Sequence, residues 1–180
     1  MHTIAKRKQG KEGLMAIKLD MSKAYDQVEW DYLEVIMRKM GFSESWISLV
    51  MMCVTTVSCE VLINGEPKGK IKPSSGLRQA DPISPYLFLL CAEGLSMIIK
   101  KKEAVGQLRG VGVSKQAPLV SHLFFANDSI IFYRATMEEC KQVAEVLDIG
   151  QKINRDKTSL FFNKNTRADI QNGVKDTFSA

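Results

Sequence analysis

The chain has 180 residues, of which 45% are hydrophobic and 25% charged, and a formal net charge of +5 at pH 7. This composition is typical of a globular protein, the length is sufficient for one domain with its own core, and no repeat or linker-like segment predicts a second domain. The longest apolar run, near residues 86–92, is far shorter than the roughly 20 residues of a membrane span, and no secretory signal follows the basic start.

The first predicted element is a strand at residues 14–22, where apolar side chains alternate along LMAIKLDMS. Met15, Ile17 and Leu19 fall on one face of this strand. Asp20 falls on the other face, near the end of the strand. We therefore expect a strand with one buried face and a carboxylate on its exposed side.

Two helices are predicted to follow this strand. Apolar side chains at helical spacing predict a helix at residues 29–40, which Gly41 ends. Ser43 is a typical N-cap for a second helix at residues 44–54.

A hairpin and a loop are predicted before the next helix. The segments CEVLI and KGKIK flank residues 64–67, whose sequence Asn-Gly-Glu-Pro favours a turn. Residues 73–84 have no periodicity and are predicted to form a loop. Ser84 followed by Pro85 is typical of a helix start, and this helix is expected to run to about residue 102.

The segment HLFFANDSIIFY, residues 122–133, predicts a second hairpin after a short strand at residues 110–113. Its two apolar halves flank Asn127 and Asp128, and both residue types tolerate the positive φ of a two-residue turn. We therefore expect Asp128 at the tip of this hairpin.

A helix and a strand complete the predicted elements. Thr136 and Glu139 form a capping box for a helix at residues 137–149, and residues 157–163 form the last strand. The order of elements predicts an α+β fold, in which helices pack on one face of an antiparallel sheet.

The exposed face of this sheet is expected to carry Asp20 together with Asp128. Carboxylate oxygens are the ligands that Mg²⁺ prefers, so the two residues predict a divalent metal site. The alternative is that Asp20 merely ends a strand and Asp128 merely forms a turn, and spacing alone leaves both interpretations open.

Three segments closely resemble successive motifs of the reverse transcriptases of non-LTR, LINE-type retrotransposons, particularly the plant copies. KLDMSKAYDQVEW (18–30), GLRQADPISPYLF (76–88) and HLFFANDSIIF (122–132) are similar to motifs A, B and C of the palm. QKINRDKTSLFF (151–162) is similar to motif D. The resemblance covers about residues 10–166, with the four motifs in the family's order.

This resemblance implies three regions in the chain. Residues 14–166 are expected to be a polymerase palm, residues 1–13 a basic remnant of the fingers, and residues 167–180 a C-terminal tail. The fingers and thumb are therefore expected to be incomplete or absent.

The resemblance implies catalytic roles for Asp20, Asn127, Asp128 and Lys157. Asp20 matches the metal ligand of motif A. Motif C of active relatives has two adjacent aspartates, of which the first binds metal; here Asn127 takes its place and Asp128 is the second. Asp20 and Asp128 are thus the expected ligands of two Mg²⁺ ions. Lys157 matches a lysine that neutralises or protonates the leaving pyrophosphate, although a solvated surface lysine explains it equally well.

The resemblance also implies substrate-binding roles. Tyr25 matches the aromatic residue that crowds the 2′ position of the incoming sugar, with a tyrosine packed at a helix start as the alternative. Arg78, Gln79 and Ala80 belong to the loop that contacts the nucleotide and the template. Asp26 also fits the family pattern, but a carboxylate in the first turn of a helix explains it.

Two residues depart from the family pattern. Asn127 is neutral, and its amide NH₂ cannot bind a cation, so it weakens the metal site. Ala80 replaces a glycine, and its methyl group hinders a positive φ and a close approach of the nucleotide. We therefore expect a polymerase whose activity is lost or severely weakened.

The expected partners are an RNA template, a DNA primer and deoxynucleoside triphosphates, and we expect an intracellular protein, nuclear or cytoplasmic, without a membrane contact. The alternatives are a non-catalytic nucleic-acid-binding remnant, a functionless translated fossil, and an unrelated metal-dependent nucleotidyl transferase. The scattered cysteines and two histidines predict no zinc site and no disulfide framework, so buried free thiols are expected at Cys53, Cys59, Cys91 and Cys140.

Overall fold

The computed structural model describes residues 13–20, 24–112, 117–125, 128–150 and 158–179. Two compact units divide the chain: Met1–Ser22 with Leu95–Ala180 form the first, and Lys23–Gly94 form the second. The sequence predicts a single domain instead. The second unit escapes prediction because no linker-like composition marks the points where it leaves and rejoins the first.

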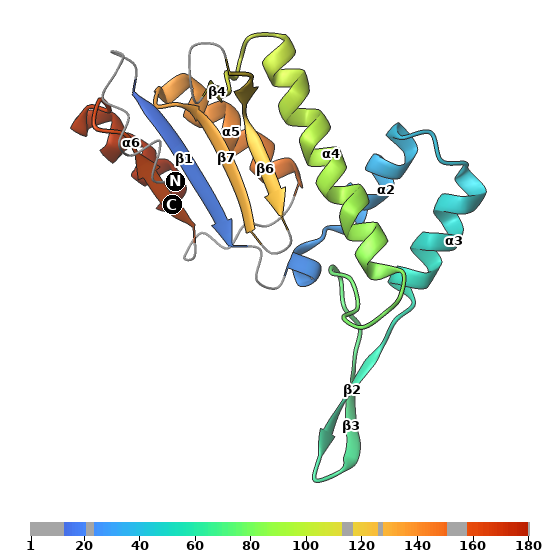
Figure 1. Ribbon diagram of the computed structural model, residues 1–180. Helices are drawn as coiled ribbons and strands as arrows, with labels where there is room; N and C mark the ends of the chain where they lie inside the picture. The colour runs from blue at the N-terminus through green and yellow to red at the C-terminus, as the bar shows by residue number, and fades with distance from the viewer. Residues whose placement is uncertain (1–12, 21–23, 113–116, 126–127, 151–157, 180) are drawn as a thin grey trace. The chain divides into compact units, whose positions relative to one another are not determined.

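An antiparallel four-stranded sheet, in the order β6-β7-β1-β8, forms the centre of the first unit (Figure 1). Its strands are β1 (Leu14–Asp20), β6 (His122–Phe125), β7 (Asp128–Arg134) and β8 (Ser159–Phe162). The central strand β1 pairs with β7 on one side and with β8 on the other. The short strands β4 (Val111–Gly112) and β5 (Leu119–Val120) form a separate pair in the same unit.

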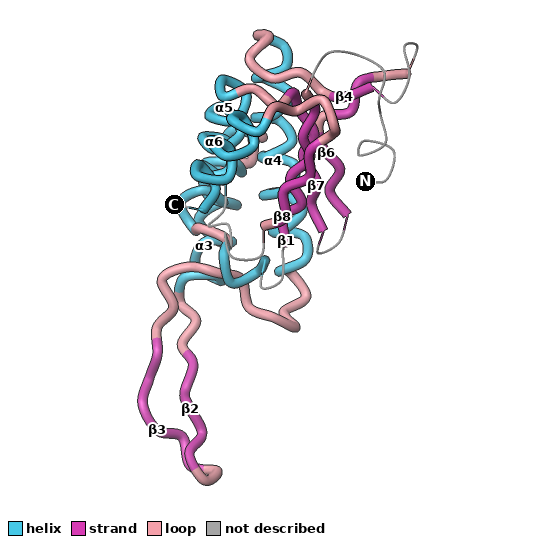
Figure 2. The backbone as a smooth tube through the Cα atoms, turned by 90° about the vertical axis from the view of Figure 1, so that its left-hand side faces the viewer, coloured by secondary structure: helices cyan, strands magenta, loops and turns pink. Residues whose placement is uncertain are grey.

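Helices cover one face of this sheet, as the sequence predicts. Figure 2 shows α5 (Met137–Gly150) and α6 (Ala168–Ser179) on the same side of the strands, and the second half of α4 (Ser84–Ala104) contributes to the same core. The buried core residues are Met15, Ile17, Leu19, Leu95, Ile99, Leu108, Ile131, Tyr133, Ala135, Cys140, Val143, Val146, Leu147, Val174 and Phe178. The α+β fold is therefore confirmed.

The strand β1 is more buried than its alternation predicts. Met15, Ile17 and Leu19 lie in the core as expected, but Ala16 on the other face is fully buried too. Ala16 pairs with Phe132 on one neighbouring strand and with Phe161 on the other. Because paired residues share a face of the sheet, the two large rings flank the small alanine and cover it.

The second unit is mainly helical. It contains the short 3₁₀ helix η1 (Ala24–Gln27), α2 (Trp30–Lys39), α3 (Glu44–Thr55) and the first half of α4. The predicted helix ends are confirmed for α2, which is followed by Gly41 at φ +87°, and for α3, where the Ser43 hydroxyl accepts a hydrogen bond from the Trp46 N–H at 3.4 Å.

The second unit also carries the hairpin of β2 (Cys59–Ile63) and β3 (Glu66–Ile71). Its turn is shorter than predicted, because Ile63 pairs directly with Glu66 and only Asn64 and Gly65 lie between them. Both turn residues have positive φ, +54° and +83°, as a two-residue hairpin turn of this kind requires. Every residue of the two strands is exposed, and Figure 1 shows them extending away from α2 and α3.

The N-terminus of α5 confirms half of the predicted capping box. The Glu139 N–H donates to the Thr136 hydroxyl at 3.2 Å. The Glu139 carboxylate does not cap Thr136 in return; it is buried and accepts hydrogen bonds from the Arg134 N–H at 3.0 Å, the Arg109 N–H at 3.3 Å and the Arg134 side chain. The nearby arginine attracts the carboxylate more strongly than a neutral amide does.

Two further expectations differ from the structure. Residues 167–180, predicted as a tail, contain helix α6, whose Val174 and Phe178 are buried in the core. Cys91 and Cys140 are buried free thiols as predicted, but Cys53 and Cys59 are exposed. These two lie near the end of α3 and at the start of β2, where they stay accessible to solvent. None of the described helices has the length and apolar character needed to cross a membrane.

Candidate functional site

The central pair of the sheet brings Asp20 and Asp128 together. Asp20 is the last residue of β1 and Asp128 the first of β7, and the two are directly paired in the antiparallel register. The neighbouring pair, Leu19 with Ser129, is buried at 3% and 2% exposure. The sheet register therefore joins two acidic positions that are far apart in the sequence.

The register also determines the face on which these two positions lie. Paired residues of an antiparallel ladder share a face, and successive residues alternate between faces. Leu19 belongs to the core under the helices, so the next position on β1, Asp20, belongs to the opposite face together with its partner Asp128. This placement agrees with the predicted convergence of the two carboxylates. Their role as metal ligands stays a prediction.

Asp128 lies one position away from where the sequence predicts it. Phe125 pairs with Asp128, so Asp128 begins β7 and is not part of the turn. The pairing of β6 with β7 therefore includes Asp128, which the sequence places in the turn between the two strands. Asn127 itself, and also Lys157, lie outside the described residues.

Tyr25 is held at both its backbone and its ring. It lies in η1 of the second unit, where its carbonyl oxygen accepts a hydrogen bond from the Leu77 N–H at 2.6 Å. Its ring contacts that of Phe88 on α4, with 5.3 Å between the ring centroids. The alternative of a packed tyrosine therefore describes its surroundings correctly. The role of Tyr25 in crowding the 2′ position of the incoming sugar stays a prediction. Asp26 is exposed and lies in the first turn of the same short 3₁₀ helix, so the predicted first-turn carboxylate is confirmed.

Ala80 adopts the backbone conformation that its sequence disfavours. Its φ is +66°, in the left-handed region where a Cβ atom costs about 1–2 kcal/mol. The sequence predicts that a methyl group hinders this conformation, and the structure shows that the loop adopts it nevertheless. In the following turn, the Asp81 carboxylate accepts a hydrogen bond from the Ile83 N–H at 3.1 Å.

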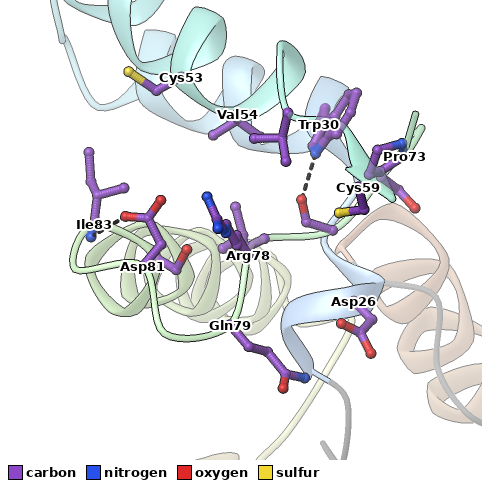
Figure 3. A pocket seen from close by; sticks show the side chains of 15 residues that line it. Asp26, Trp30, Cys53, Val54, Cys59, Pro73, Arg78, Gln79, Asp81 and Ile83 are labelled. Carbon is purple, nitrogen blue, oxygen red and sulfur yellow. Dashed lines mark hydrogen bonds between the residues drawn. The ribbon is translucent and has the colours of Figure 1, made fainter. Parts of the chain in front are cut away.

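The loop that contains Arg78 and Gln79 lines a pocket of about 300 Å³ in the second unit (Figure 3). In Figure 3 the Arg78 side chain points toward α3, whereas Gln79 points away from it. The pocket walls are formed by Asp26, Trp30, Cys53, Val54, Val57, Cys59, Pro73, Ser75, Gly76, Leu77, Arg78, Gln79, Asp81, Ile83 and Ser84. One arginine between two aspartates, over a largely apolar wall, gives this pocket the means to bind a partly polar ligand.

The sequence motifs predict the loop of this pocket, but they do not predict the opposite wall, which includes Trp30, Cys53 and Val54. Trp30 reads as the start of a helix, and Val54 and Cys53 read as part of an ordinary apolar helix face. No local signal predicts that they face the loop, because the contact joins segments distant in the sequence.

A metal site has no complete set of ligands among the described residues. Within these residues, no group of three or more His, Cys, Asp and Glu side chains is placed to hold a metal ion. The donor chemistry of Asp20 and Asp128 nevertheless suits a hard divalent cation, because both residues carry carboxylate groups at paired positions.

Two solved structures share this fold. Telomerase from Candida tropicalis in complex with a fragment of telomeric RNA matches with a TM-score of 0.57 at 16% identity, over 89% of this chain and 28% of that chain. The apo telomerase from the same organism, truncated from its C-terminal domain, matches with a TM-score of 0.56 at 18% identity, over 91% of this chain and 33% of that chain. At this level of identity the likeness concerns the fold alone.

Several curated proteins are similar in sequence. An uncharacterised mitochondrial protein of Arabidopsis thaliana is 50% identical over 68 residues, which cover 38% of this chain and 56% of that protein. The Pol polyprotein of the type-1 retrotransposable element R2 of Popillia japonica is 25% identical over 64% of this chain and 18% of its own length. The type-2 R2 polyprotein of Drosophila melanogaster is 25% identical over 77% of this chain and 13% of its own length.

The chain therefore spans 56% of the first of these relatives and less than a fifth of the two retrotransposon polyproteins. A family model described as reverse transcriptase (RNA-dependent DNA polymerase) matches residues 1–173, nearly the whole chain. With its palm-like sheet and this match, the chain belongs to the reverse transcriptase family.

Proposed function

We propose that this chain is the palm of a retrotransposon RNA-directed DNA polymerase, which transfers nucleotides to a DNA primer on an RNA template. The pairing of Asp20 with Asp128 at the ends of β1 and β7 is the observation that carries this proposal. The family match and the R2 polyproteins among the relatives support it. The telomerase neighbours support the fold alone, and an RNA template is proposed from the family match.

Reverse transcriptases generally use divalent metal ions, and we propose Mg²⁺ for this chain. Asp20 and Asp128 would hold it, since their carboxylate oxygens are the ligands that a hard cation prefers. When bound, two such ions supply charge stabilisation for the attacking and the leaving oxygen. The contribution of the chain is to bring two carboxylate-bearing residues together at directly paired positions of neighbouring strands.

The substrate-binding roles are divided among residues of the second unit. Tyr25 crowds the 2′ position of the incoming sugar and so favours deoxynucleoside triphosphates. Arg78 provides a positive charge for phosphate oxygens, and Gln79 provides an amide for the nucleotide or the template. Outside the second unit, Lys157 has a catalytic role, in which it neutralises or protonates the leaving pyrophosphate.

Asn127 and Ala80 weaken this activity. Asn127 is neutral where active relatives carry an aspartate, so the metal ions lose one of the charges that hold them. Ala80 keeps the loop in a left-handed conformation only at an energetic cost. We propose that the polymerase fold is retained while the rate of nucleotide transfer is strongly reduced.

Primer extension tests this proposal. The chain and its Asn127→Asp variant are compared on a DNA primer annealed to an RNA template with Mg²⁺, and Asp20→Ala in the Asn127→Asp background serves as control. Because metal ions stabilise the transition state by several kcal/mol, Asn127→Asp is expected to raise extension at least about tenfold, and Asp20→Ala to abolish it. Equal extension by the unmodified chain and by Asn127→Asp, or extension that survives Asp20→Ala, would contradict the proposal.

A non-catalytic nucleic-acid-binding remnant is the second candidate; the neutral Asn127 favours it, and the net charge of +5 allows it. Such a protein binds an RNA–DNA hybrid with an affinity that falls steeply with salt, because bound counterions are released. Hybrid binding that persists in Asp20→Ala, without extension by Asn127→Asp, would favour this candidate over the polymerase.

A further inference from the structure

Trp30 makes a long-range contact that its position at the start of α2 does not require. Its indole N–H donates a hydrogen bond to the Gly76 carbonyl oxygen at 2.7 Å, across 46 residues of sequence. The dashed line in Figure 3 marks this bond at the edge of the pocket. The hydrogen bond attaches the loop before α4 to the first residue of α2.

Two backbone hydrogen bonds hold the same loop. The Gly76 N–H donates to the Val28 carbonyl oxygen at 2.8 Å, and the Leu77 N–H donates to the Tyr25 carbonyl oxygen at 2.6 Å. Val28 and Leu77 are buried at 0% and 4% exposure, so water does not compete for these bonds. The loop therefore lies directly against the segment that carries Tyr25.

Gly76 allows this close approach. Its φ is +92°, and a Cβ atom built on it would lie 3.1 Å from the Cα and carbonyl oxygen atoms of Asp26. Any side chain at this position would push the loop away from η1. The contact therefore depends on a glycine on one side and on an indole donor on the other.

Tyr25 is the residue that this arrangement immobilises. Leu77 fixes its backbone, and Phe88 contacts its ring at 5.3 Å between centroids with a tilt of 50°. Trp30 does not touch Tyr25 through any of these bonds; it acts through Gly76, the neighbour of Leu77. Arg78 and Gln79 follow next in the same loop.

We propose that Trp30 is a positioning residue that sets the preference between deoxynucleotides and ribonucleotides. By holding Gly76 it keeps Leu77 against Tyr25, and so keeps the tyrosine where it crowds a 2′-hydroxyl. This inference rests on the proposed role of Tyr25 and deepens it. Discrimination by steric crowding depends on placement within a fraction of an ångström, so a loosened loop admits the larger sugar before the unit loses its fold.

The Trp30→Phe variant isolates the hydrogen bond, because it keeps an aromatic ring and removes the N–H donor. Trp46→Phe is the matched control, since Trp46 lies on α3, is 47% exposed and does not line the pocket. Phe88→Leu is a second variant that loosens the Tyr25 ring from the other side. Amide hydrogen exchange at Gly76 and Leu77 reports directly whether the loop is held.

The functional readout is the ratio of two affinities, measured on the full chain without turnover. An RNA template presents a uridine opposite the next position of a DNA primer with a dideoxy end, and the dissociation constants of ATP and dATP are determined with Mg²⁺. A neutral hydrogen bond contributes about 0.5–1.5 kcal/mol, so Trp30→Phe is expected to reduce the preference for dATP roughly two- to tenfold. Phe88→Leu is expected to reduce it as well, and Trp46→Phe to leave it unchanged.

Three results would overturn the inference. Unchanged exchange at Gly76 and Leu77 in Trp30→Phe would show that the indole does not hold the loop. Faster exchange with an unchanged ratio of affinities would show that the loop does not set the preference. In both cases the proposed polymerase function stands, whereas a chain that binds neither nucleotide on the primed template would contradict the proposed function together with the inference.

Discussion

The two longer hairpins of this protein start from similar sequence signals and reach opposite degrees of burial. The hairpin of β6 and β7 joins the central sheet, and Ile131 and Tyr133 of β7 are each only 1% exposed. In the hairpin of β2 and β3, every residue is exposed, including Leu62 at 68%. Local turn chemistry therefore determines that a hairpin forms, and neighbouring strands and helices determine whether it is buried.

The difference in burial has a structural cause. β7 pairs with β1 as well as β6, and helices cover its apolar side. Within the part of the chain that the structure describes, β2 and β3 pair only with each other. Because an isolated two-stranded hairpin is marginally stable in water, the β2–β3 hairpin contributes little to the stability of the chain.

Matched isoleucine variants test this contrast most strongly. Ile131→Ala is expected to lower the free energy of unfolding by about 2–5 kcal/mol, because it leaves a cavity in the core. Ile63→Ala removes the same atoms from a side chain that is 52% exposed, and the expected change is within about 0.5 kcal/mol. Urea unfolding measures both changes. Equal destabilisation by the two variants would show that the exposed hairpin is part of a packed core.

Thiol reactivity extends the comparison to the cysteines. Burial raises the pKa of Cys91 to about 12 and also raises the pKa of Cys140, whereas Cys53 and Cys59 are exposed. Since the thiolate is the reacting form, iodoacetamide at neutral pH is expected to modify Cys53 and Cys59 at least about a hundredfold faster than the buried pair. Mass spectrometry of peptides follows the rates. Rapid modification of Cys140 in the folded chain would contradict its place in the core.

Removing the backbone strain at Ala80 is expected to stabilise the chain, by less than Ile131→Ala destabilises it. Ala80→Gly is expected to raise the free energy of unfolding by about 1 kcal/mol, because glycine adopts a φ of +66° without steric cost. Ala92→Gly, in the middle of α4, is the control and is expected to lower it by about 1 kcal/mol. If both variants destabilise the chain, Ala80 is not strained.

The ion pairs of Arg38 are expected to have the smallest effect. Arg38 donates to Glu44 at 2.8 Å and to Glu34 at 2.9 Å on the exposed side of the second unit. Its hydrogen bond lowers the pKa of Glu44, so any stabilisation is present above the ordinary carboxyl pKa and is lost as the pH falls. Unfolding curves of Glu44→Gln and of the unmodified chain are expected to coincide at neutral pH in 150 mM salt, and a clear shift of the midpoint would contradict this.

Sequence patterns predict those elements whose signals are local. Alternation predicts β1 and the hairpins, Ser43 predicts the start of α3, and Gly41 predicts the end of α2. Helix α6 is not predicted, because Gly173 and several polar residues interrupt its pattern, and only packing against the core shows that Val174 is buried.

In the candidate site, too, local signals predict some features, and the others depend on the tertiary fold. The motifs identify Asp20 and Asp128, and the strand pattern places Asp20 at the end of β1. Their pairing, and the position of Asp128 in β7 instead of the turn, depend on how the strands pair with one another. Local sequence patterns do not predict that pairing. Local sequence patterns also do not predict the Trp30–Gly76 hydrogen bond, because it joins segments that only the tertiary fold brings together.

The metal site can be tested without turnover, by adding Mn²⁺ to the isotope-labelled chain and following its amide signals by NMR. We expect paramagnetic broadening to appear first at Leu19, Asp20, Asp128 and Ser129, to be weaker at Leu14 at the opposite end of β1, and to disappear in Asp20→Asn. Broadening that is absent from these four amides, or that survives Asp20→Asn unchanged, would show that the paired aspartates do not bind a divalent cation.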